Sequence, residues 1–389
     1  MNKLVVLVMF LGLVAAGCLG GGRAATPTPT QQATATATVQ QQAPIKIGFM
    51  GPLTGDVANL GESARNGFQM AVDEINVKGG VDGRQIQAVF EDGKCDPQVA
   101  TDAANKLVNI DHVPVIIGEL CSGATLAAAP IVEQAKVVLL SYCSSNPAIT
   151  DAGDYVFRDY ISDAYQGKVA AEYMYNTTGK RKVAILASQD AWAIGLRDVF
   201  KARFEELGGK IVANEVFKHD ATDVRTQLTK IKAANPDGVY LPAYTQGVSI
   251  GLKQARELGI TVPMVGGDAA DDPAIPQAVG AGAEGFVYVV PKTSKSAVAQ
   301  AFNAAYKTKY NADPLICAAQ AYDAMNIIAG IMKTQGTDST KIKSALYDVQ
   351  GFDGASGTVG FDENGDLKNP ATEFKTYRNG TLAQLEEQG

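Results

Sequence analysis

Short apolar runs alternate with amphipathic segments along most of this chain, and the alternation restarts about halfway. In the first series, predicted strands lie at 45–49, 113–117 and 137–140, and a further one ends at Phe90. The second series begins at Lys182, and its predicted strands lie at 183–187, 210–217, 238–241 and 262–265. Strands that alternate with helices at this spacing predict parallel sheets with right-handed crossovers. Two series predict an α/β fold with two doubly wound, Rossmann-like lobes.

The first residues have the pattern of an export signal. An apolar run from Leu4 to Ala16 follows Lys3 and is too short to span a bilayer, which takes about 20 residues as a helix. This pattern predicts a signal peptide over 1–17. The run ends in Leu13-Val14-Ala15-Ala16-Gly17-Cys18, which resembles a bacterial or archaeal lipoprotein processing site. That resemblance implies a lipid on Cys18; the alternative is an ordinary signal peptide that is cut nearby.

A low-complexity segment separates this signal from the rest of the chain. Residues 18–43 are mainly Gly, Thr, Pro, Gln and Ala, and Arg23 is their only charged residue. Such a composition cannot bury enough apolar surface to offset the entropy of ordering. We therefore expect a flexible linker that holds a soluble domain at the membrane, exported to the cell surface or the periplasm.

Charge and composition argue against several classes of function. Lys and Arg number 34 and Asp and Glu number 41, a formal charge of −7, and no long basic cluster interrupts the acidic balance. We therefore expect no nucleic-acid partner. His112 and His219 are the only histidines, so a His-rich metal centre or a Ser-His-Asp triad is not expected. The G-x-G-x-x-G match at 280–285 precedes a strand, whereas a dinucleotide site follows one. We expect no enzyme, no cofactor and no metal.

The loops after the predicted strands are where a ligand would bind. In open α/β sheets, ligands bind beyond the carboxyl ends of the strands. The corresponding loops are rich in Ser, Gly, Asp and Tyr, and they span 50–61, 119–123, 141–147, 188–195, 243–247 and 266–272. If the two lobes face each other, all six loops line one cleft, as in a clamshell-like binding protein.

Several motifs give this pattern a family resemblance. They are Gly51-Pro52-Leu53-Thr54-Gly55, Asp73-Glu74-Ile75-Asn76, Lys78-Gly79-Gly80, Asp92-Gly93-Lys94-Cys95-Asp96-Pro97, Ile116-Ile117-Gly118-Glu119-Leu120-Cys121-Ser122, Gly357-Thr358-Val359-Gly360-Phe361 and Gly365-Asp366-Leu367. From Ile45 to about Leu382 the chain resembles the periplasmic branched-chain amino acid binding proteins of ABC importers, which have the type I periplasmic-binding fold. The resemblance implies three hinge crossings, near 159–162, 288–292 and 351–357. It implies an N-terminal lobe of 44–160 and 291–354, and a C-terminal lobe of 161–290 and 355–389.

A free amino acid carries two opposite charges, and removing both from water is costly unless each is compensated. Ser122 precedes a helix predicted from Ala124, where free N–H groups favour a carboxylate, and it matches a family position. By resemblance Ser145 is a second hydroxyl at the head group, although either serine could simply cap a helix or a turn. The resemblance aligns Asp268 with the acidic partner of the ammonium group, and Asp271 and Asp272 are nearby alternatives.

The resemblance also implies the walls of the pocket. Tyr244 matches a family tyrosine that contacts the ligand, with a core or surface tyrosine as the alternative. Trp192 takes the place of a ring that closes over the ligand, and Leu60 makes the wall more apolar. The remaining candidates for lining the ligand pocket are Cys121, Cys143 and Cys317. A large Trp against these residues suggests a compact pocket for an aliphatic or mildly polar side chain.

Once Cys18 is assigned to a lipid, an even number of cysteines remains in an oxidising compartment. The resemblance implies a disulfide between Cys95 and Cys121, with two buried free thiols as the alternative. Cys143 and Cys317 fall at pocket-lining positions and could form a second disulfide or serve as two small apolar wall residues. We favour the wall interpretation.

The resulting hypothesis is a monomeric, lipid-anchored receptor that captures a small amino acid and delivers it to the permease subunits of an ABC importer. One alternative is a binder of another small solute, such as an amide, a urea-like compound or an aromatic acid. The other is a ligand-sensing domain that acts through a partner protein.

Overall fold

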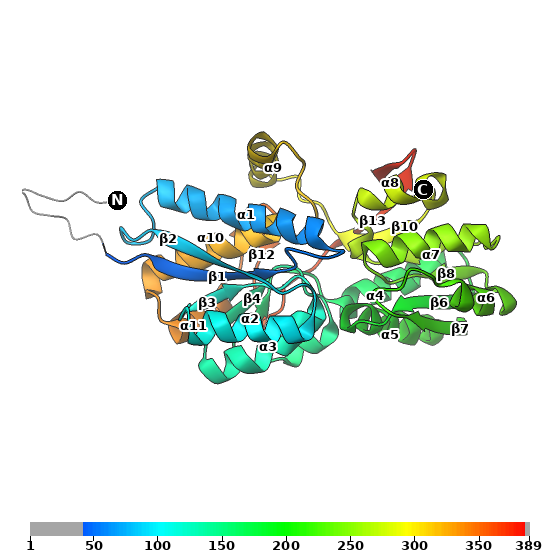
Figure 1. Cartoon of the computed structure of the whole chain (residues 1–389), viewed down its shortest axis with the longest axis horizontal. Helices are drawn as coiled ribbons and strands as arrows, with labels where there is room; N and C mark the ends of the chain where they lie inside the picture. Colours follow the sequence, from blue (N-terminus) through cyan, green and yellow to red (C-terminus); the bar gives the residue numbers. More distant parts are fainter. Residues whose placement is uncertain (1–41, 386–389) are drawn as a thin grey trace, which may run out of the picture. The chain divides into compact units, whose positions relative to one another are not determined.

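The computed structural model describes residues 42–385 of the chain. The predicted signal peptide, Cys18 and most of the linker lie outside these described residues. The predicted fold class is confirmed, because two separate sheets of mainly parallel strands are each flanked by helices (Figure 1). The two sheets follow each other in the chain, as the two series of the sequence predict.

The first sheet is entirely parallel and has the strand order β2-β1-β3-β4-β5. Its strands are β1 (Ile45–Gly51), β2 (Ile86–Asp92), β3 (Val115–Ile117), β4 (Val138–Ser141) and β5 (Val156–Arg158). The helices of this lobe are α1 (Ala58–Val77), α2 (Pro97–Asn109), α3 (Ser122–Ala135), α10 (Ala318–Gln335) and α11 (Ser339–Tyr347). The late helix α10 packs along α1, so this lobe uses residues from both ends of the described chain (Figure 1).

The second sheet has the order β14-β13-β10-β9-β8-β6-β7. Its parallel strands are β6 (Lys182–Ser188), β7 (Lys210–Phe217), β8 (Gly238–Tyr240), β9 (Met264–Gly266) and β10 (Val287–Pro291). The antiparallel strands β13 (Thr372–Arg378) and β14 (Thr381–Gln384) extend its edge beside β10. The helices around it are α4 (Asp163–Glu172), α5 (Ala191–Glu206), α6 (Arg225–Ala233), α7 (Thr245–Glu257) and α8 (Ala274–Val279).

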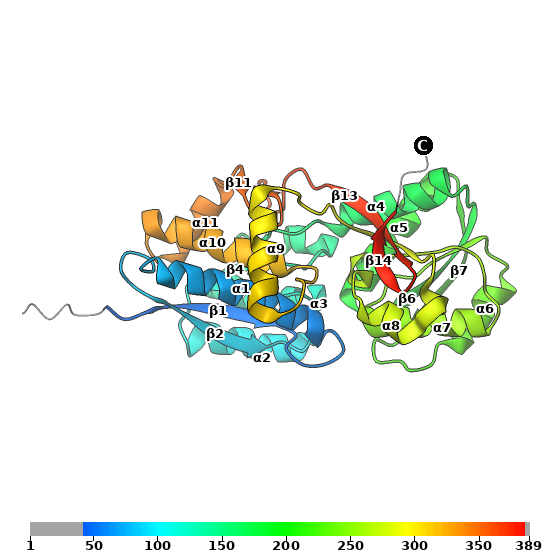
Figure 2. The same ribbon diagram turned by 90° about the horizontal axis from the view of Figure 1, so that it is seen from above.

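The remaining elements lie around the passages between the sheets. Helix α9 (Ala297–Tyr310) lies over α1 and α10 (Figure 2), where Phe302 and Tyr306 pack against Met70 and Ala318. A two-stranded ribbon of β11 (Phe352–Asp353) and β12 (Thr358–Val359) precedes the last passage to the second sheet. After this ribbon, Phe361 packs edge-on against Phe157 of β5, with ring centroids 5.5 Å apart.

Most predicted elements are present, with shifted ends. Helix α1 begins at Ala58 and not near Glu62, and α3 begins at Ser122, two residues before the predicted start. Strand β5 was not expected, because its three residues follow a short irregular segment. The segment at Gly280–Ala283 is a 3₁₀ turn before β10.

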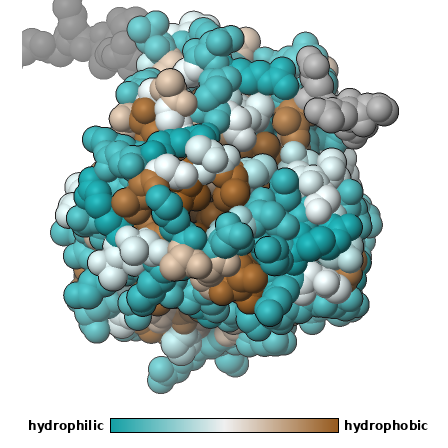
Figure 3. Space-filling model, turned by 90° about the vertical axis from the view of Figure 1, so that its right-hand side faces the viewer, coloured by the Kyte–Doolittle hydropathy of each residue, from teal (hydrophilic) through white to brown (hydrophobic). Residues whose placement is uncertain are grey.

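Apolar side chains fill the space between each sheet and its helices. Phe49 of β1 is fully buried and stacks on Tyr142 at 5.4 Å, while Phe200 of α5 stacks on Tyr240 of β8 at 3.8 Å. The end of the molecule seen in Figure 3 is mostly hydrophilic, with apolar side chains gathered near its middle. Within residues 42–385, no helix combines the length and the apolar character that crossing a bilayer requires.

Candidate functional site: a cavity at the carboxyl ends of both sheets

The loops that follow the parallel strands of the two sheets meet around one small cavity of about 20 Å³. Both lobes contribute to its wall. The lining residues are Leu60, Leu120, Cys143, Ser145, Tyr160, Trp192, Tyr244, Asp268, Ala269 and Ile316. The space is enough for about one water molecule, and small-molecule pockets are typically roughly 300–1,000 Å³.

Six of the residues singled out from the sequence come together in this wall: Leu60, Cys143, Ser145, Trp192, Tyr244 and Asp268. Ser122, Cys121 and Cys317 do not line it in this state. Their immediate neighbours Leu120 and Ile316 do, so these segments still reach the cavity. Asp271 and Asp272 also stand outside the wall: Asp271 pairs with Lys375 at 2.8 Å, and Asp272 accepts a hydrogen bond from Thr245.

Ser122 and Ser145 form a connected pair on the first lobe. Ser122 is the first residue of α3 and is fully buried; its Oγ accepts hydrogen bonds from the backbone N–H groups of Ser145 at 3.2 Å and Asn146 at 3.1 Å. The Ser145 hydroxyl in turn donates to the carboxylate of Asp163 at 3.0 Å. The helix N-terminus and two hydroxyls therefore lie together, which is a donor-rich setting suited to an anion.

Asp268 supplies a carboxylate from the second lobe. It follows β9 and is 5% exposed, and its Oδ2 accepts hydrogen bonds from the Tyr160 phenol at 2.7 Å and from Gln166 Nε2 at 3.2 Å. Burial raises the pKa of Asp268 to about 6, although the two donors oppose that rise. The group is therefore ionised at neutral pH but carries an incompletely compensated charge.

A second carboxylate, Asp163, lies close to Asp268. It is fully buried in the first turn of α4, and Gln166 Nε2 reaches both acids, at 3.4 Å to Asp163 Oδ1 and 3.2 Å to Asp268 Oδ2. Burial raises the pKa of Asp163 well above its ordinary value, and the neighbouring Asp268 adds to the rise. Asp163 and Gln166 do not line the cavity themselves, but they lie beside Asp268, which does, and the two neighbouring acids make its surroundings suited to a cationic group.

Two aromatic rings form another part of the wall. Trp192, in the first turn of α5, packs against Tyr244 with ring centroids 4.7 Å apart, and both side chains are at least 95% buried. Gly267 leaves room for this arrangement, because a Cβ at that position would lie 3.1 Å from the Trp192 ring. The wall is thus apolar where these two rings lie.

A buried ion pair holds the loop that carries Ser145. Arg158 at the end of β5 is fully buried and bonds to both carboxylate oxygens of Asp366 at 2.7 Å. Its Nη1 donates to the backbone carbonyls of Ser145 at 3.1 Å and Asn146 at 2.9 Å. A bidentate arginine with this many partners fixes a backbone position firmly.

All four cysteines after Cys18 are joined in pairs. Cys95 bonds to Cys121, as the family resemblance implied, with Cα atoms 5.3 Å apart. Cys143 bonds to Cys317, with Cα atoms 5.5 Å apart, so the interpretation as two separate wall residues is wrong in this structure. The loop after β4 and the residue before α10 approach closely enough for a bridge, which spacing along the chain did not reveal. Cys143 still lines the cavity.

Contacts between the lobes close the cavity from outside. Asn59 of α1 donates to Asp272 at 2.7 Å, and Asn146 donates to the carbonyl of Ala191 at 2.6 Å. His219, after β7, lies with its Nε2 3.4 Å from Asp56 Oδ1 on the other lobe. These polar links span the two sides of the cavity, so this structure represents a closed arrangement.

Sequence reasoning missed Tyr160, Asp163 and Gln166. The family resemblance implied a hinge crossing near 159–162, and no residue of this crossing or of the helix after it was considered for a role in the cavity. One signal was available: Asp163 and Gln166 stand three residues apart, on one face of a helix that Ser162 caps. Among residues 42–385, no cluster of three or more His, Cys, Asp or Glu side chains is arranged to hold a metal ion.

Comparison with known proteins gives one consistent result. Residues 44–380 match the family described as periplasmic binding protein. A leucine-, isoleucine-, valine-, threonine- and alanine-binding protein of Pseudomonas aeruginosa is 32% identical over 346 residues, covering 88% of this chain and 92% of the relative.

Two solved structures show the same fold. A leucine binding protein from Thermotoga maritima is 30% identical with a TM-score of 0.83, covering 88% of this chain and 98% of that one. A branched-chain amino acid transporter substrate binding protein from Streptococcus pneumoniae, solved with isoleucine, is 32% identical with a TM-score of 0.81. That match covers 87% of this chain and 97% of the other.

Proposed function

The chain belongs to the periplasmic binding protein family, and from this premise we propose that it binds a free amino acid between its lobes and delivers it to the permease of an ABC importer. Family members are exported solute-binding proteins. The observation that carries the proposal is the placement of a buried carboxylate, Asp268, and of Ser145 in the wall of one cavity, with Ser122 at the N-terminus of α3 bonded to Ser145 from behind the wall. Relatives whose names specify leucine, isoleucine and valine support a small aliphatic ligand.

In this proposal the two charges of the ligand meet opposite partners. The ammonium group binds at Asp268, where Gln166 and Tyr160 already position the carboxylate. The ligand carboxylate lies at the N-terminus of α3 and accepts from the hydroxyls of Ser122 and Ser145. The Ser145 N–H, which Ser122 Oγ now occupies, becomes a further donor when the ligand replaces that contact. The aliphatic side chain then packs against Trp192.

Ligand entry requires the lobes to separate, because a cavity of about 20 Å³ is far too small for leucine. We propose a hinge motion of two rigid lobes: one holds 44–160 and 291 to about 369, and the other holds 161–290 with strands β13 and β14. The contact of Phe361 with Phe157 favours a third crossing nearer to Pro370 than the sequence suggested. Closure around the ligand would present the lobes to the permease in a fixed arrangement.

We further propose that the protein is a monomer tethered through a lipid on Cys18 and the linker 18–43. Metabolic labelling with radioactive palmitate tests this directly. Label in the wild type and its loss in Cys18→Ala, with release of the variant into the medium or the periplasm, supports the tether. An unlabelled wild-type protein cut elsewhere would contradict it.

Calorimetric titration of residues 42–389 tests the ligand assignment. We expect binding of one or more of L-leucine, L-isoleucine, L-valine, L-alanine and L-threonine. Asp268→Ala should weaken binding at least tenfold, which is about 1.4 kcal/mol, because the ammonium loses its counter-charge. Asp271→Ala, three residues on but outside the cavity wall, is the matched control and should leave the affinity within about twofold. Binding of benzoate or acetamide with no response to any amino acid would overturn the assignment.

A further inference from the structure

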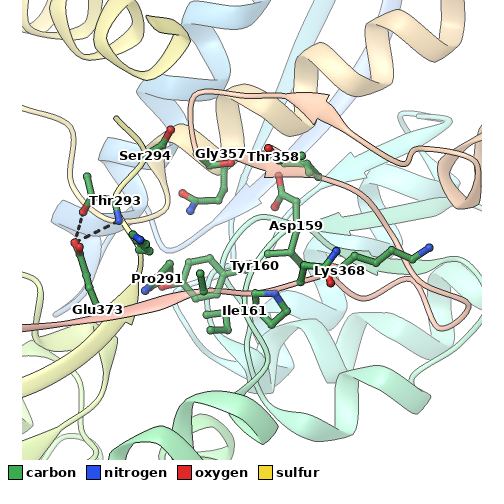
Figure 4. A pocket seen from close by; sticks show the side chains of 18 of the residues that line it. Asp159, Tyr160, Ile161, Pro291, Thr293, Ser294, Gly357, Thr358, Lys368 and Glu373 are labelled. Atoms are coloured by element: carbon green, nitrogen blue, oxygen red, sulfur yellow. Dashed lines mark hydrogen bonds between the residues drawn. The ribbon is translucent and has the colours of Figure 1, made fainter. Parts of the chain in front are cut away.

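A second and larger pocket lies where the chain passes between the two lobes. Its volume is about 520 Å³, within the range of roughly 300–1,000 Å³ for small-molecule sites. Its wall comes mainly from four segments: 159–161, 291–295, 356–359 and 367–373 (Figure 4). These segments include every passage between the sheets that the described residues contain. Tyr160 is the only residue that this hinge pocket shares with the central cavity.

An acid without a partner faces this hinge pocket. Asp159 is 2% exposed, and neither of its carboxylate oxygens has a hydrogen-bond partner in the part of the chain that the structure describes. Figure 4 shows its side chain pointing toward Gly357 and Thr358 across the pocket. Burial raises the pKa of Asp159 well above its ordinary value, and the nearby Asp323 adds to the rise. An unpartnered buried carboxyl is costly and calls for a donor.

The acids near Asp159 do not share a hydrogen-bond network with it, because their carboxylates already accept hydrogen bonds from other groups. Asp323 accepts from the backbone N–H groups of Ala355 at 2.8 Å and Ser356 at 2.7 Å, and from the Ser356 hydroxyl at 2.6 Å. Glu373 accepts from the Thr293 hydroxyl and from Gln384. Asp159 is therefore the acid of this wall whose hydrogen-bonding capacity is unused.

Cationic side chains lie at the mouth of the same pocket. Lys292 and Lys295 line it and are exposed, and neither forms a salt bridge in the part of the chain that the structure describes. Lys368 also lines it, but its Nζ donates to Gln350 at 2.8 Å. The hinge pocket thus combines one buried acid with two lysines at its rim.

We propose that the hinge pocket is a second ligand site, for a small dipolar molecule of the amino acid or short peptide class. The amino group of this molecule donates to Asp159, and its carboxylate pairs with Lys292 and Lys295. A simple amine would leave the lysines unmatched, and a simple anion would leave Asp159 without a donor. The wall consists of the segments that connect the two lobes. A molecule bound there therefore stabilises the arrangement of the lobes in which the pocket has this shape. Its binding is therefore coupled to ligand binding in the central cavity, and the coupling is reciprocal.

Calorimetry with diglycine as the probe tests this site. The purified chain is first saturated with L-leucine, so that the central cavity is filled before diglycine is added. A parallel titration uses Asp268→Ala without leucine, because this variant lacks the carboxylate proposed to hold an amino group in the central cavity. We expect diglycine to bind in both cases and Asp159→Asn to weaken that binding at least tenfold while leucine binding is retained.

Three controls define the ligand class. The exposed Asp353→Asn should leave diglycine binding unchanged, and the Lys292→Ala/Lys295→Ala double variant should weaken it. Methylamine and acetate, each carrying one charge of diglycine, should bind more than tenfold more weakly. Absence of diglycine binding to the wild type, undiminished binding to Asp159→Asn, or equal binding of methylamine would overturn the proposal.

Discussion

The phenol of Tyr160 donates a hydrogen bond to the carboxylate of Asp268 at 2.7 Å, and both groups line the central cavity. Tyr160 lies in the passage after β5, whereas Asp268 follows β9 of the second sheet. This bond therefore ties the acid proposed to recognise the ligand to a segment that connects the two lobes. It also stabilises the charged form of an acid that burial would otherwise keep protonated.

Amino acid binding should depend on pH through Asp268. Burial holds its pKa at about 6, above the ordinary value of 3.8, so the carboxylate takes up a proton as the pH falls through about 6. A protonated acid cannot pair with the ligand ammonium, so leucine affinity should fall below pH 6, by up to about tenfold per pH unit. Calorimetry between pH 5 and 8 measures this dependence.

Two variants test the origin of that pH dependence. Asp268→Asn should bind weakly at every pH, with no midpoint near 6. Tyr160→Phe removes a donor to the charged carboxylate, so the pKa and the midpoint should both move upward. A wild-type affinity that stays constant from pH 5 to 8 would contradict this account of the site.

His219 should stabilise the closed arrangement in a pH-dependent way. It lies between Asp190, 3.8 Å from Nδ1, and Asp56, 3.4 Å from Nε2, and these acids raise its pKa from 6.5 to about 10. A histidine whose pKa is raised on folding stabilises fully below its unfolded pKa, near 6.5, and loses that contribution as the pH rises through about 10. Because His219 is partly exposed, its contribution to the free energy of unfolding should be at most about 1 kcal/mol.

Urea unfolding at pH 7 and pH 10.5 measures this contribution. His219→Gln should be less stable than the wild type at pH 7, and the difference should shrink at pH 10.5. Asp56→Asn should remove part of the same pH dependence, because it takes away the partner on the other lobe. Equal differences at the two pH values would exclude the electrostatic role of His219.

The pair of Arg158 and Asp366 should be essential to stability. Asp366→Ala leaves a fully buried guanidinium without its counter-charge, a change that typically costs about 3–5 kcal/mol. Leucine affinity should also fall, since Arg158 holds the backbone of Ser145 and Asn146. Urea unfolding and calorimetry measure the two effects.

An exposed pair provides the control for this experiment. Lys307 and Asp313 lie 2.8 Å apart with side chains 63% and 75% exposed, so Asp313→Ala should change stability by less than about 0.5 kcal/mol. If Asp366→Ala were as mild as Asp313→Ala, the supporting role of the buried pair would be wrong.

The bridge between Cys143 and Cys317 should contribute about 2–4 kcal/mol to stability. A Cys143→Ala/Cys317→Ala variant should lose this amount in urea unfolding and should also bind leucine differently, because Cys143 lines the cavity. The Cys95→Ala/Cys121→Ala variant should lose comparable stability with a smaller effect on binding, since neither residue lines it. Peptide mapping without reductant that finds free thiols at Cys143 and Cys317 would contradict the pairing.

The sequence predicted the architecture well because alternating strands and helices strongly constrain a parallel sheet. It also singled out Asp268 and Ser145, which follow strands β9 and β4 and so fall at the edge where ligands bind. It left the Cys143–Cys317 bridge as the less favoured alternative, and it did not predict the closeness of Asp163 to Asp268. Both depend on contacts between segments far apart in the chain, and local periodicity carries no information about them. Strand β5 was missed because its run Val156–Arg158 ends in a charged residue and follows an irregular segment, whereas the equally short β3 is wholly apolar.

A crystal structure with bound L-leucine tests the central claim most directly. The account predicts the ligand nitrogen within hydrogen-bonding distance of the Asp268 carboxylate and the ligand carboxylate at the N-terminus of α3, beside Ser122 and Ser145. Leucine bound with its nitrogen remote from Asp268, or bound outside the space between the two sheets, would contradict it.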